Sequence, residues 1–193
     1  VICGMAGARQ GWAEAPYASV PGVPLQPSAF RQIETKDTRL SVTIIHGLSQ
    51  ADPPDVMRGE ETQIAGFLSQ VPAFDGVLCL PGTHTKWAWL EAGRVTRFRT
   101  FMTGELFSIL RDHSILRHSV ADTVIETSSK TLAAFEDGLA VAALDPAALT
   151  SHLFTLRAAG ILSTRPAEAS LAHLSGLLIG SETTAMRGQI DDR

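Results

Sequence analysis

The chain has 193 residues, of which 45% are hydrophobic and 19% are charged, and its formal net charge at pH 7 is −4. This composition supports a sizeable core, one large or two small domains, and excludes a disordered chain. The densest basic group, Arg94, Arg97 and Arg99, is too sparse for a nucleic-acid surface, and no apolar stretch has the length of a membrane span. We therefore expect neither nucleic acid nor a membrane as a partner.

The first residues, Val1 to Met5, are typical of a buried strand that enters a glycine turn. Because chains rarely begin inside a strand, we expect an internal segment of a longer protein. Residues 4–12 then form a loop with three glycines, Arg9 and Trp12. Its backbone can approach a ligand closely, and Arg9 could bind a carboxylated substrate. The alternative is a surface loop in which Trp12 covers the core.

Residues 16–27 contain four prolines and predict irregular structure along the surface. The β-branched residues within 40–46 predict a strand, and residues 52–54 a loop. A helix follows, because its apolar residues recur at helical spacing up to Pro72: Ile64, Ala65, Leu68 and Val71.

Two carboxylates, Glu60 and Glu61, lie at the start of this helix. Acidic side chains in a first helical turn often only complement the helix dipole. The functional interpretation is a carboxylate that orients a reacting hydroxyl or takes its proton. About one helix and one strand separate the pair from Gly82, so both groups can face one cleft.

After Asp75 the apolar period changes, and residues 77–80, 87–90 and 94–102 predict three short antiparallel strands. The first strand ends in a Pro-Gly turn, followed by two hydroxyls, a histidine and a lysine: Gly82, Thr83, His84, Thr85 and Lys86. Such a hairpin tip can bind a phosphate, although its spacing is not that of a P-loop. Arg97 and Arg99 alternate on one strand face, which is more typical of a solvated face than of a ligand clamp.

Helices are predicted from Thr103 to about His113 and within residues 132–144, 146–159 and 166–186. Thr103 is the expected N-cap, although Thr103-Gly104-Glu105 could also line the cleft. The best domain boundary lies between residues 74 and 75. It separates a loop-rich α/β part, 1–74, from a hairpin-plus-helix part, 75–193.

Cys3 and Cys79 both lie in apolar, strand-like runs, which predicts buried reduced thiols and fits a cytoplasmic protein. The six histidines show no spacing typical of metal ligands. We therefore expect no metal ligand from this segment, and this spacing disfavours a metal-dependent hydrolase.

Five ordered blocks carry a resemblance to a known family: GMAGARQGW–APY–SVP, VMRGEETQ, PGTHTKW, FRTFMTGEL and LSGLLIGSETTAMR. Together they closely resemble the 2-dehydro-3-deoxygalactonokinases, sugar-acid kinases of the acetate/sugar kinase, Hsp70 and actin superfamily. The resemblance implies an α/β, actin-like (ribonuclease H-like) fold of two domains, with mixed sheets flanked by helices, present only in part. It also implies transfer of phosphate from ATP, with Mg²⁺, to the 6-hydroxyl of 2-dehydro-3-deoxy-D-galactonate in galactonate catabolism.

By the same resemblance, residues 82–86 are similar to the second phosphate loop of these kinases. Glu60 is the first choice for the catalytic base, with Glu61 as the alternative. The segments that resemble substrate-contacting loops supply Gly7, Ala8, Arg9, Gln10, Trp12, Thr103 and Glu105.

The chain departs from the family pattern at both ends. Such kinases begin with an Asp-Trp-Gly-[Ser/Thr] motif, whose Asp handles magnesium, and end with an adenosine segment. Neither motif occurs within residues 1–193, so we expect little kinase activity from this chain alone. A non-catalytic remnant that binds a sugar acid or a protein partner is the alternative. A homodimer is one candidate for the oligomeric state.

Overall fold

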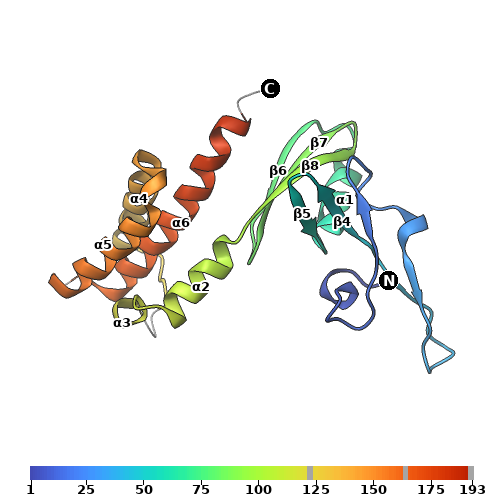
Figure 1. Cartoon of the computed structure of the whole chain (residues 1–193), viewed down its shortest axis with the longest axis horizontal. Coiled ribbons are helices and arrows are strands. Elements are labelled where there is room, and N and C mark those ends of the chain that lie inside the picture. Colours follow the sequence, from blue (N-terminus) through green and yellow to red (C-terminus); the bar gives the residue numbers. More distant parts are fainter. Residues whose placement is uncertain (121–123, 163–164, 191–193) are drawn as a thin grey trace. The chain divides into compact units, whose positions relative to one another are not determined.

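The structure is a computed structural model that describes residues 1–120, 124–162 and 165–190. The chain forms two compact units, Val1–Thr100 and Phe101–Arg193, each with its own hydrophobic core (Figure 1). Mixed sheets and helices confirm an α/β protein. The division lies later than residue 74, because the hairpin strands share a core with the segments before them. The predicted boundary between two actin-like domains stays a prediction.

The first unit begins with short elements. They are η1 (Gly4–Gly7), β1 (Tyr17–Ser19), η2 (Pro27–Ala29), β2 (Arg31–Ile33) and β3 (Val42–Ile44). Strands β2 and β3 pair antiparallel, which confirms the strand predicted within residues 40–46. The strand end predicted at Val1–Met5 is only a single parallel bridge between Ile2 and Ile44.

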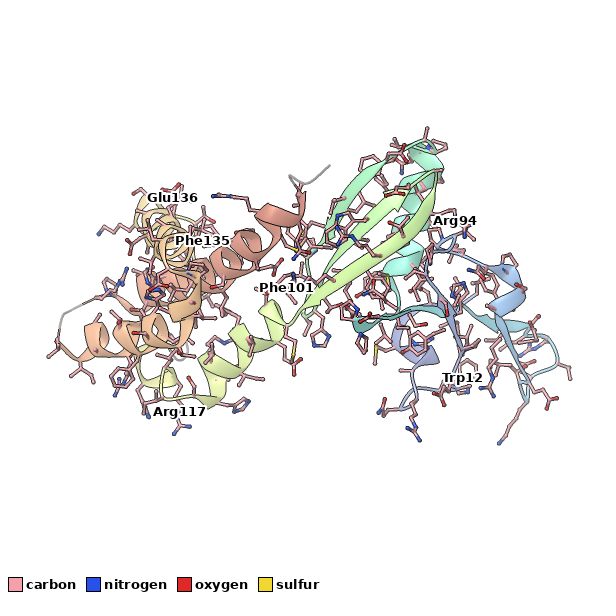
Figure 2. The ribbon with its side chains drawn as sticks, turned by 45° about the horizontal axis from the view of Figure 1, so that its top comes forward. Trp12, Arg94, Phe101, Arg117, Phe135 and Glu136 are labelled. Atoms are coloured by element: carbon pink, nitrogen blue, oxygen red, sulfur yellow. The ribbon has the colours of Figure 1, made fainter. Side chains whose placement is uncertain are left out.

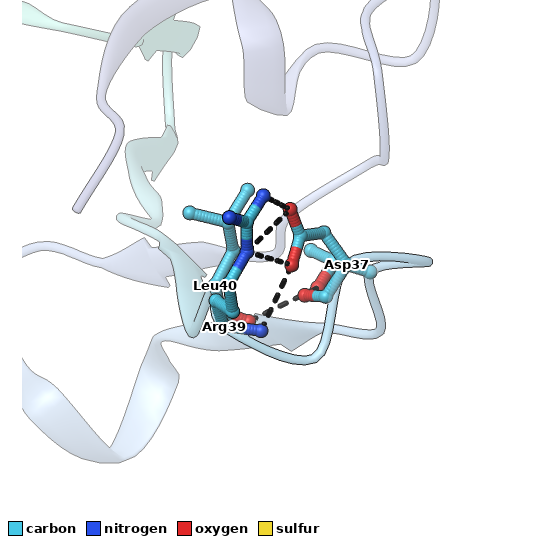
Figure 3. Close-up of polar contacts among 4 residues, drawn as sticks. Asp37, Arg39 and Leu40 are labelled. Carbon is cyan, nitrogen blue, oxygen red and sulfur yellow. Dashed lines mark hydrogen bonds and ion pairs between the residues drawn. The ribbon is translucent and has the colours of Figure 1, made fainter.

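An exposed ion pair closes the connection between β2 and β3 (Figure 3). Arg39 Nη2 lies 2.6 Å from Asp37 Oδ2, and the Arg39 backbone N–H donates to Asp37 Oδ1. The Arg39 guanidinium holds the pKa of Asp37 below its ordinary value. Because water screens both groups, this pair contributes little to stability.

A second sheet leads to the first long helix. Strand β4 (Gly47–Ala51) pairs parallel with β1 and antiparallel with β5 (Pro54–Met57). The loop predicted at residues 52–54 is therefore the tight turn of a hairpin, and Pro54 already pairs with Ala51. Helix α1 (Glu60–Gln70) follows, within one residue of its predicted end.

The three predicted hairpin strands are confirmed as β6 (Gly76–Leu80), β7 (Thr85–Glu91) and β8 (Arg94–Phe101). Gly22 forms an antiparallel bridge with Val95 of β8. Arg94 lies at the start of this strand (Figure 2), and its Nη2 donates a hydrogen bond to the backbone oxygen of Pro21 at 3.0 Å. The shared core joins side chains from β4, β5, α1, β7 and β8: Leu48, Met57, Ile64, Leu68, Leu90, Val95 and Phe98. Burial of this apolar surface makes the hairpin part of the first unit.

The second unit is helical, as predicted. Its elements are α2 (Thr103–His113), α3 (Arg117–Val120), α4 (Ser129–Leu144), η3 (Pro146–Ala148), α5 (Leu149–Leu162) and α6 (Ala167–Ile190). A capping box between Ser128 and Thr131 starts α4. The long helix α6 contributes Leu171, Leu174 and Leu178 to the core of this unit.

Three details correct or limit the sequence-based expectations. The N-cap of α2 is Met102, so Thr103 is already the first helical residue. Cys3 and Cys79 are both exposed; β6 is an edge strand, and Cys79 lies on its outward side. Within the described residues, no single helix could cross a membrane, although the bent pair of residues 129–144 and 146–162 meets the criteria of length and composition.

Candidate functional site

The predicted phosphate turn lies between β6 and β7, in the first unit. Leu80 pairs with Lys86, and the residues between them form the turn. Thr85 and Lys86 are only 5% and 6% exposed. Because neighbouring side chains on a strand point to opposite faces, the two do not share an environment. Lys86 lines a cavity of the first unit, whereas Thr85 does not line it.

The Lys86 ammonium pairs with the predicted base. Its Nζ lies 2.9 Å from Glu60 Oε1 and donates to the backbone oxygen of His84 at 3.2 Å. Both side chains are largely withdrawn from water, so the attraction between their charges is stronger than at an open surface. Lys86 therefore orients the Glu60 carboxylate beside the turn.

The two glutamates at the start of α1 differ in what their carboxylates can reach. Gly59 precedes the helix at φ 111°, a conformation that favours glycine, and provides no side-chain cap. The Arg58 backbone N–H instead donates to Glu60 Oε2 at 3.0 Å, and the Gly59 N–H donates to Glu61 Oε2 at 2.6 Å. Both carboxylates thus lie where an acidic side chain complements the dipole at the start of a helix, as the structural interpretation predicts. Of the two glutamates, Glu60 also lines two cavities of the first unit, and Glu61 lines neither of them.

Glu61 is fully buried and accepts a further hydrogen bond from the Thr62 hydroxyl at 3.1 Å. Burial raises the pKa of Glu61 above its ordinary value, and the nearby charge of Glu60 raises it further. Glu61 lines neither of the two cavities beside Glu60. Its position favours a structural role at the helix start.

This burial predicts a pH-dependent effect of Glu61→Gln. Since the folded-state pKa is raised, stability from this carboxyl is complete below the unfolded value of 4.5 and is lost as pH rises through the folded-state pKa. The variant cannot ionise, so its free energy of unfolding relative to wild type should increase as pH rises. Urea unfolding at pH values on both sides of 4.5 measures this change. A difference that stays constant with pH would contradict the assignment; Glu136→Gln, exposed on α4, is the control.

A cavity of about 610 Å³ lies beside Glu60, within the size range of small-molecule sites. It brings together three segments that are distant in sequence: the loop after η1, the start of α1 and the phosphate turn. The predicted residues among those that line it are Ala8, Arg9, Gln10, Glu60, Thr83, His84 and Lys86. Residues predicted separately for substrate, proton transfer and phosphate thus share one cavity.

A second cavity of about 360 Å³ shares Arg58 and Glu60 with the first. Gly82 lines it, together with Gly59 and Gln63. The predicted phosphate turn is therefore divided: Gly82 lies at the smaller cavity, and Thr83, His84 and Lys86 lie at the larger one. Glu60 lies where the two meet.

Other predicted substrate residues lie elsewhere. Trp12 is 57% exposed, so the alternative in which it covers the core is wrong (Figure 2). Gly7 is buried against the Arg58 side chain, and a Cβ added at Gly7 would lie 2.8 Å from Arg58 Nη1. Thr103 and Glu105 belong to the second unit, in the first turn of α2.

Sequence reasoning missed the three polar side chains Glu14, Tyr17 and Arg58, and also Met5, Val56 and Met57, which line the larger cavity too. The Arg58 guanidinium lies over the Tyr17 ring, 4.2 Å from its centroid, and Nη2 donates to the backbone oxygen of Ala15 at 2.8 Å. Two signals could have found them: Arg58 immediately precedes Gly59-Glu60, and Tyr17 is the single tyrosine of the chain.

In the second unit, the Thr103 hydroxyl donates a hydrogen bond to the Glu182 carboxylate, which connects α2 to α6. Glu182 is only 6% exposed and was not among the predicted residues.

In the first unit, Arg97 and Arg99 are exposed, as expected of a solvated face, and Arg97 lies over the Trp89 ring at 3.9 Å.

The described residues contain no group of three or more His, Cys, Asp or Glu side chains that could hold a metal ion.

Comparisons with known proteins agree with the five sequence blocks. The sequence model of the 2-keto-3-deoxy-galactonokinase family matches residues 1–193. A probable 2-dehydro-3-deoxygalactonokinase of Rhizobium meliloti (strain 1021) is 45% identical over 184 residues, which cover 94% of this chain and 59% of that protein. The 2-dehydro-3-deoxygalactonokinase of Escherichia coli (strain K12) is 38% identical over 194 residues, with 98% and 62% covered.

A crystal structure of a protein from Sinorhizobium meliloti, assigned as a 2-dehydro-3-deoxygalactonokinase, superposes with a TM-score of 0.90 and 42% identity. The match covers 98% of this chain and 62% of that one. The chain thus spans about three fifths of the length of the relatives that it matches.

Proposed function

Because the chain belongs to the 2-keto-3-deoxy-galactonokinase family, we propose that its full-length form transfers the γ-phosphate of ATP to the 6-hydroxyl of 2-dehydro-3-deoxy-D-galactonate. The observation that carries this proposal is the Glu60–Lys86 ion pair, in a cavity that also contains the Arg9 loop and the phosphate turn. A carboxylate beside a phosphate-binding turn suits phosphoryl transfer to an alcohol.

In the proposed reaction, the sugar acid places its terminal hydroxyl beside the Glu60 carboxylate. Glu60 orients the hydroxyl and accepts its proton as the new O–P bond forms and the bond between the γ-phosphorus and the bridging oxygen of ATP breaks. Lys86 holds the carboxylate through Oε1, and its positive charge also favours a phosphoryl group at the adjacent turn. Magnesium bound with ATP would neutralise phosphate charge.

We further propose that the two units are parts of an actin-like (ribonuclease H-like) fold. Thr103 and Glu105 remain candidates for substrate binding. Glu60 remains the preferred base, because Glu61 is fully buried. The cytoplasm is the proposed location, since ATP and the sugar acid would both be available there. A homodimer is the assembly to test.

The proposal is tested by an ADP-release assay on the full-length form with 2-dehydro-3-deoxygalactonate. We expect turnover that depends on the sugar acid, and a loss of about 100-fold in kcat for Lys86→Met, because this change removes a charge from the reacting centre. Lys130→Met, exposed on α4, is the matched control and should retain full activity. Sugar-acid binding without any turnover would instead favour a non-catalytic remnant.

A further inference from the structure

The Arg58 guanidinium lies in the wall of the larger cavity, and its hydrogen bonding is incomplete. Tyr17 covers one face, and Nη2 donates to the backbone oxygen of Ala15. Nε and Nη1 are buried, and the described residues provide no hydrogen-bond partner for either. Buried donors without an acceptor are destabilising and rare in folded proteins. The guanidinium therefore lacks acceptors that a ligand could supply.

Its charge is also unbalanced. A guanidinium stays protonated in proteins, so Arg58 carries a positive charge at any pH of interest. Among the described residues, no carboxylate forms an ion pair with this side chain; Glu60 accepts from the backbone N–H of Arg58 instead. The ammonium of Lys86 is already paired with Glu60, and Arg9 is exposed. A negative charge that enters this cavity would be stabilised by the unpaired charge of Arg58.

We propose that Arg58 binds the carboxylate of the sugar acid and so selects an acid over a neutral sugar. This inference rests on the proposed function. A carboxylate supplies both acceptor oxygens and a negative charge, and arginine is the side chain best suited to bind it. Sequence reasoning had placed Arg9 in this role, but its side chain is exposed, and water screening weakens the contribution of an exposed charge.

The neighbours of Arg58 and Glu60 place the two groups in different surroundings. Tyr17 and Ala15 hold the guanidinium, whereas Lys86 and the backbone of Arg58 hold the Glu60 carboxylate. A six-carbon sugar acid carries its carboxylate and its terminal hydroxyl at opposite ends. Binding of the carboxylate by Arg58 would leave the hydroxyl end free to reach Glu60.

Access to Nη1 involves Gly7. This residue lies against Nη1, so closely that an added Cβ would be 2.8 Å away. Met5, Ala8 and Arg9, from the same segment, line the cavity. A small displacement of this segment would let a carboxylate reach Nη1. Glycine at position 7 leaves the space that the guanidinium occupies.

The test is calorimetric binding of 2-dehydro-3-deoxygalactonate and of its uncharged methyl ester to the full-length form. We expect wild type to bind the acid at least about tenfold more tightly than the ester, as suits a charge-assisted hydrogen bond. Arg58→Met should remove this preference by weakening acid binding alone. Arg39→Met, in the exposed β2–β3 connection, controls for the loss of one positive charge. Arg9→Met tests the competing assignment.

Three outcomes would overturn the inference. If Arg58→Met keeps the preference for the acid, or if Arg9→Met alone removes it, Arg58 is not the carboxylate ligand, although the kinase proposal stands. If wild type binds neither compound, both proposals fail. If the circular dichroism spectrum shows that Arg58→Met is unfolded, the same binding measurement is made with Arg58→Lys. Lysine keeps the positive charge but lacks the planar guanidinium with its several donors. We expect it to weaken acid binding about tenfold, and unchanged acid binding would overturn the inference.

Discussion

Replacing Glu60 by Gln is expected to lower kcat of the full-length form by about 10²–10⁴-fold, the usual contribution of a general base. Glutamine keeps the size of the side chain, but its single amide oxygen can accept from Lys86 or from the Arg58 N–H and not from both, and it cannot take a proton from the substrate. The KM for the sugar acid should change only slightly, because the cavity keeps its shape. An ADP-release assay measures both constants.

Glu61→Gln separates the two candidate bases. Its amide oxygen can still accept from the Gly59 N–H, and residue 61 lines neither cavity, so activity should stay within about threefold of wild type, a range expected when no catalytic group is lost. Glu136→Gln controls for the carboxyl-to-amide change at an exposed position. Normal turnover in Glu60→Gln would refute our assignment, and a larger loss in Glu61→Gln would transfer the role to Glu61.

Replacing Gly176 by Ala is expected to destabilise the helical unit by about 3 kcal/mol or more, at or beyond the upper end for overpacked cores. Helices α4 and α6 approach each other so closely that a Cβ at Gly176 would lie 2.1 Å from the backbone oxygen of Phe135. Figure 2 labels Phe135 on α4. Because the obstacle is backbone, a side-chain rotation cannot relieve the clash, and the two helices must separate.

Gly188→Ala in the same helix is the matched control. Among the described residues, and apart from the neighbouring backbone of α6 itself, no atom lies within 4 Å of the Cβ that would be added at this position. The change should therefore be neutral, or stabilising by up to about 1 kcal/mol through helix propensity. Urea unfolding followed by far-UV circular dichroism compares the two variants. Equal stabilities for Gly176→Ala and Gly188→Ala would contradict the close helix contact.

Local signals were sufficient for most of the secondary structure. Apolar spacing up to Pro72 predicted α1, and the change of apolar period after Asp75, with the Pro-Gly turn, predicted β6 to β8. Strand β5 was missed because Pro53 precedes it and Pro54 is its first residue, and proline usually interrupts strands. It forms because Pro54 lies at the start of the strand, where the rest of β5 pairs with β4. The burial predicted for Cys79 was wrong because an apolar neighbourhood does not identify an edge strand, and Cys3 lies outside any strand.

The sequence also predicted only part of the candidate site. Residue type and order placed a carboxylate pair before a phosphate-like turn, and the resemblance of five blocks indicated a sugar-acid kinase family, which the family comparison supports. Nothing in that order separates Glu60 from Glu61, because adjacent residues differ only in the direction of their side chains. The fold turns Glu60 toward Lys86 and buries Glu61.

The chain's order of turns, helices and motifs thus carries its family and its secondary structure, because those depend on spacing between near neighbours. The partners of Arg58 depend on contacts that span the first unit: Ala15 and Tyr17 lie about forty residues before it in sequence. Only packing of the N-terminal segment against the start of α1 covers two guanidinium nitrogens without giving them an acceptor. For this reason the carboxylate site that we propose became visible in the folded structure rather than in the sequence.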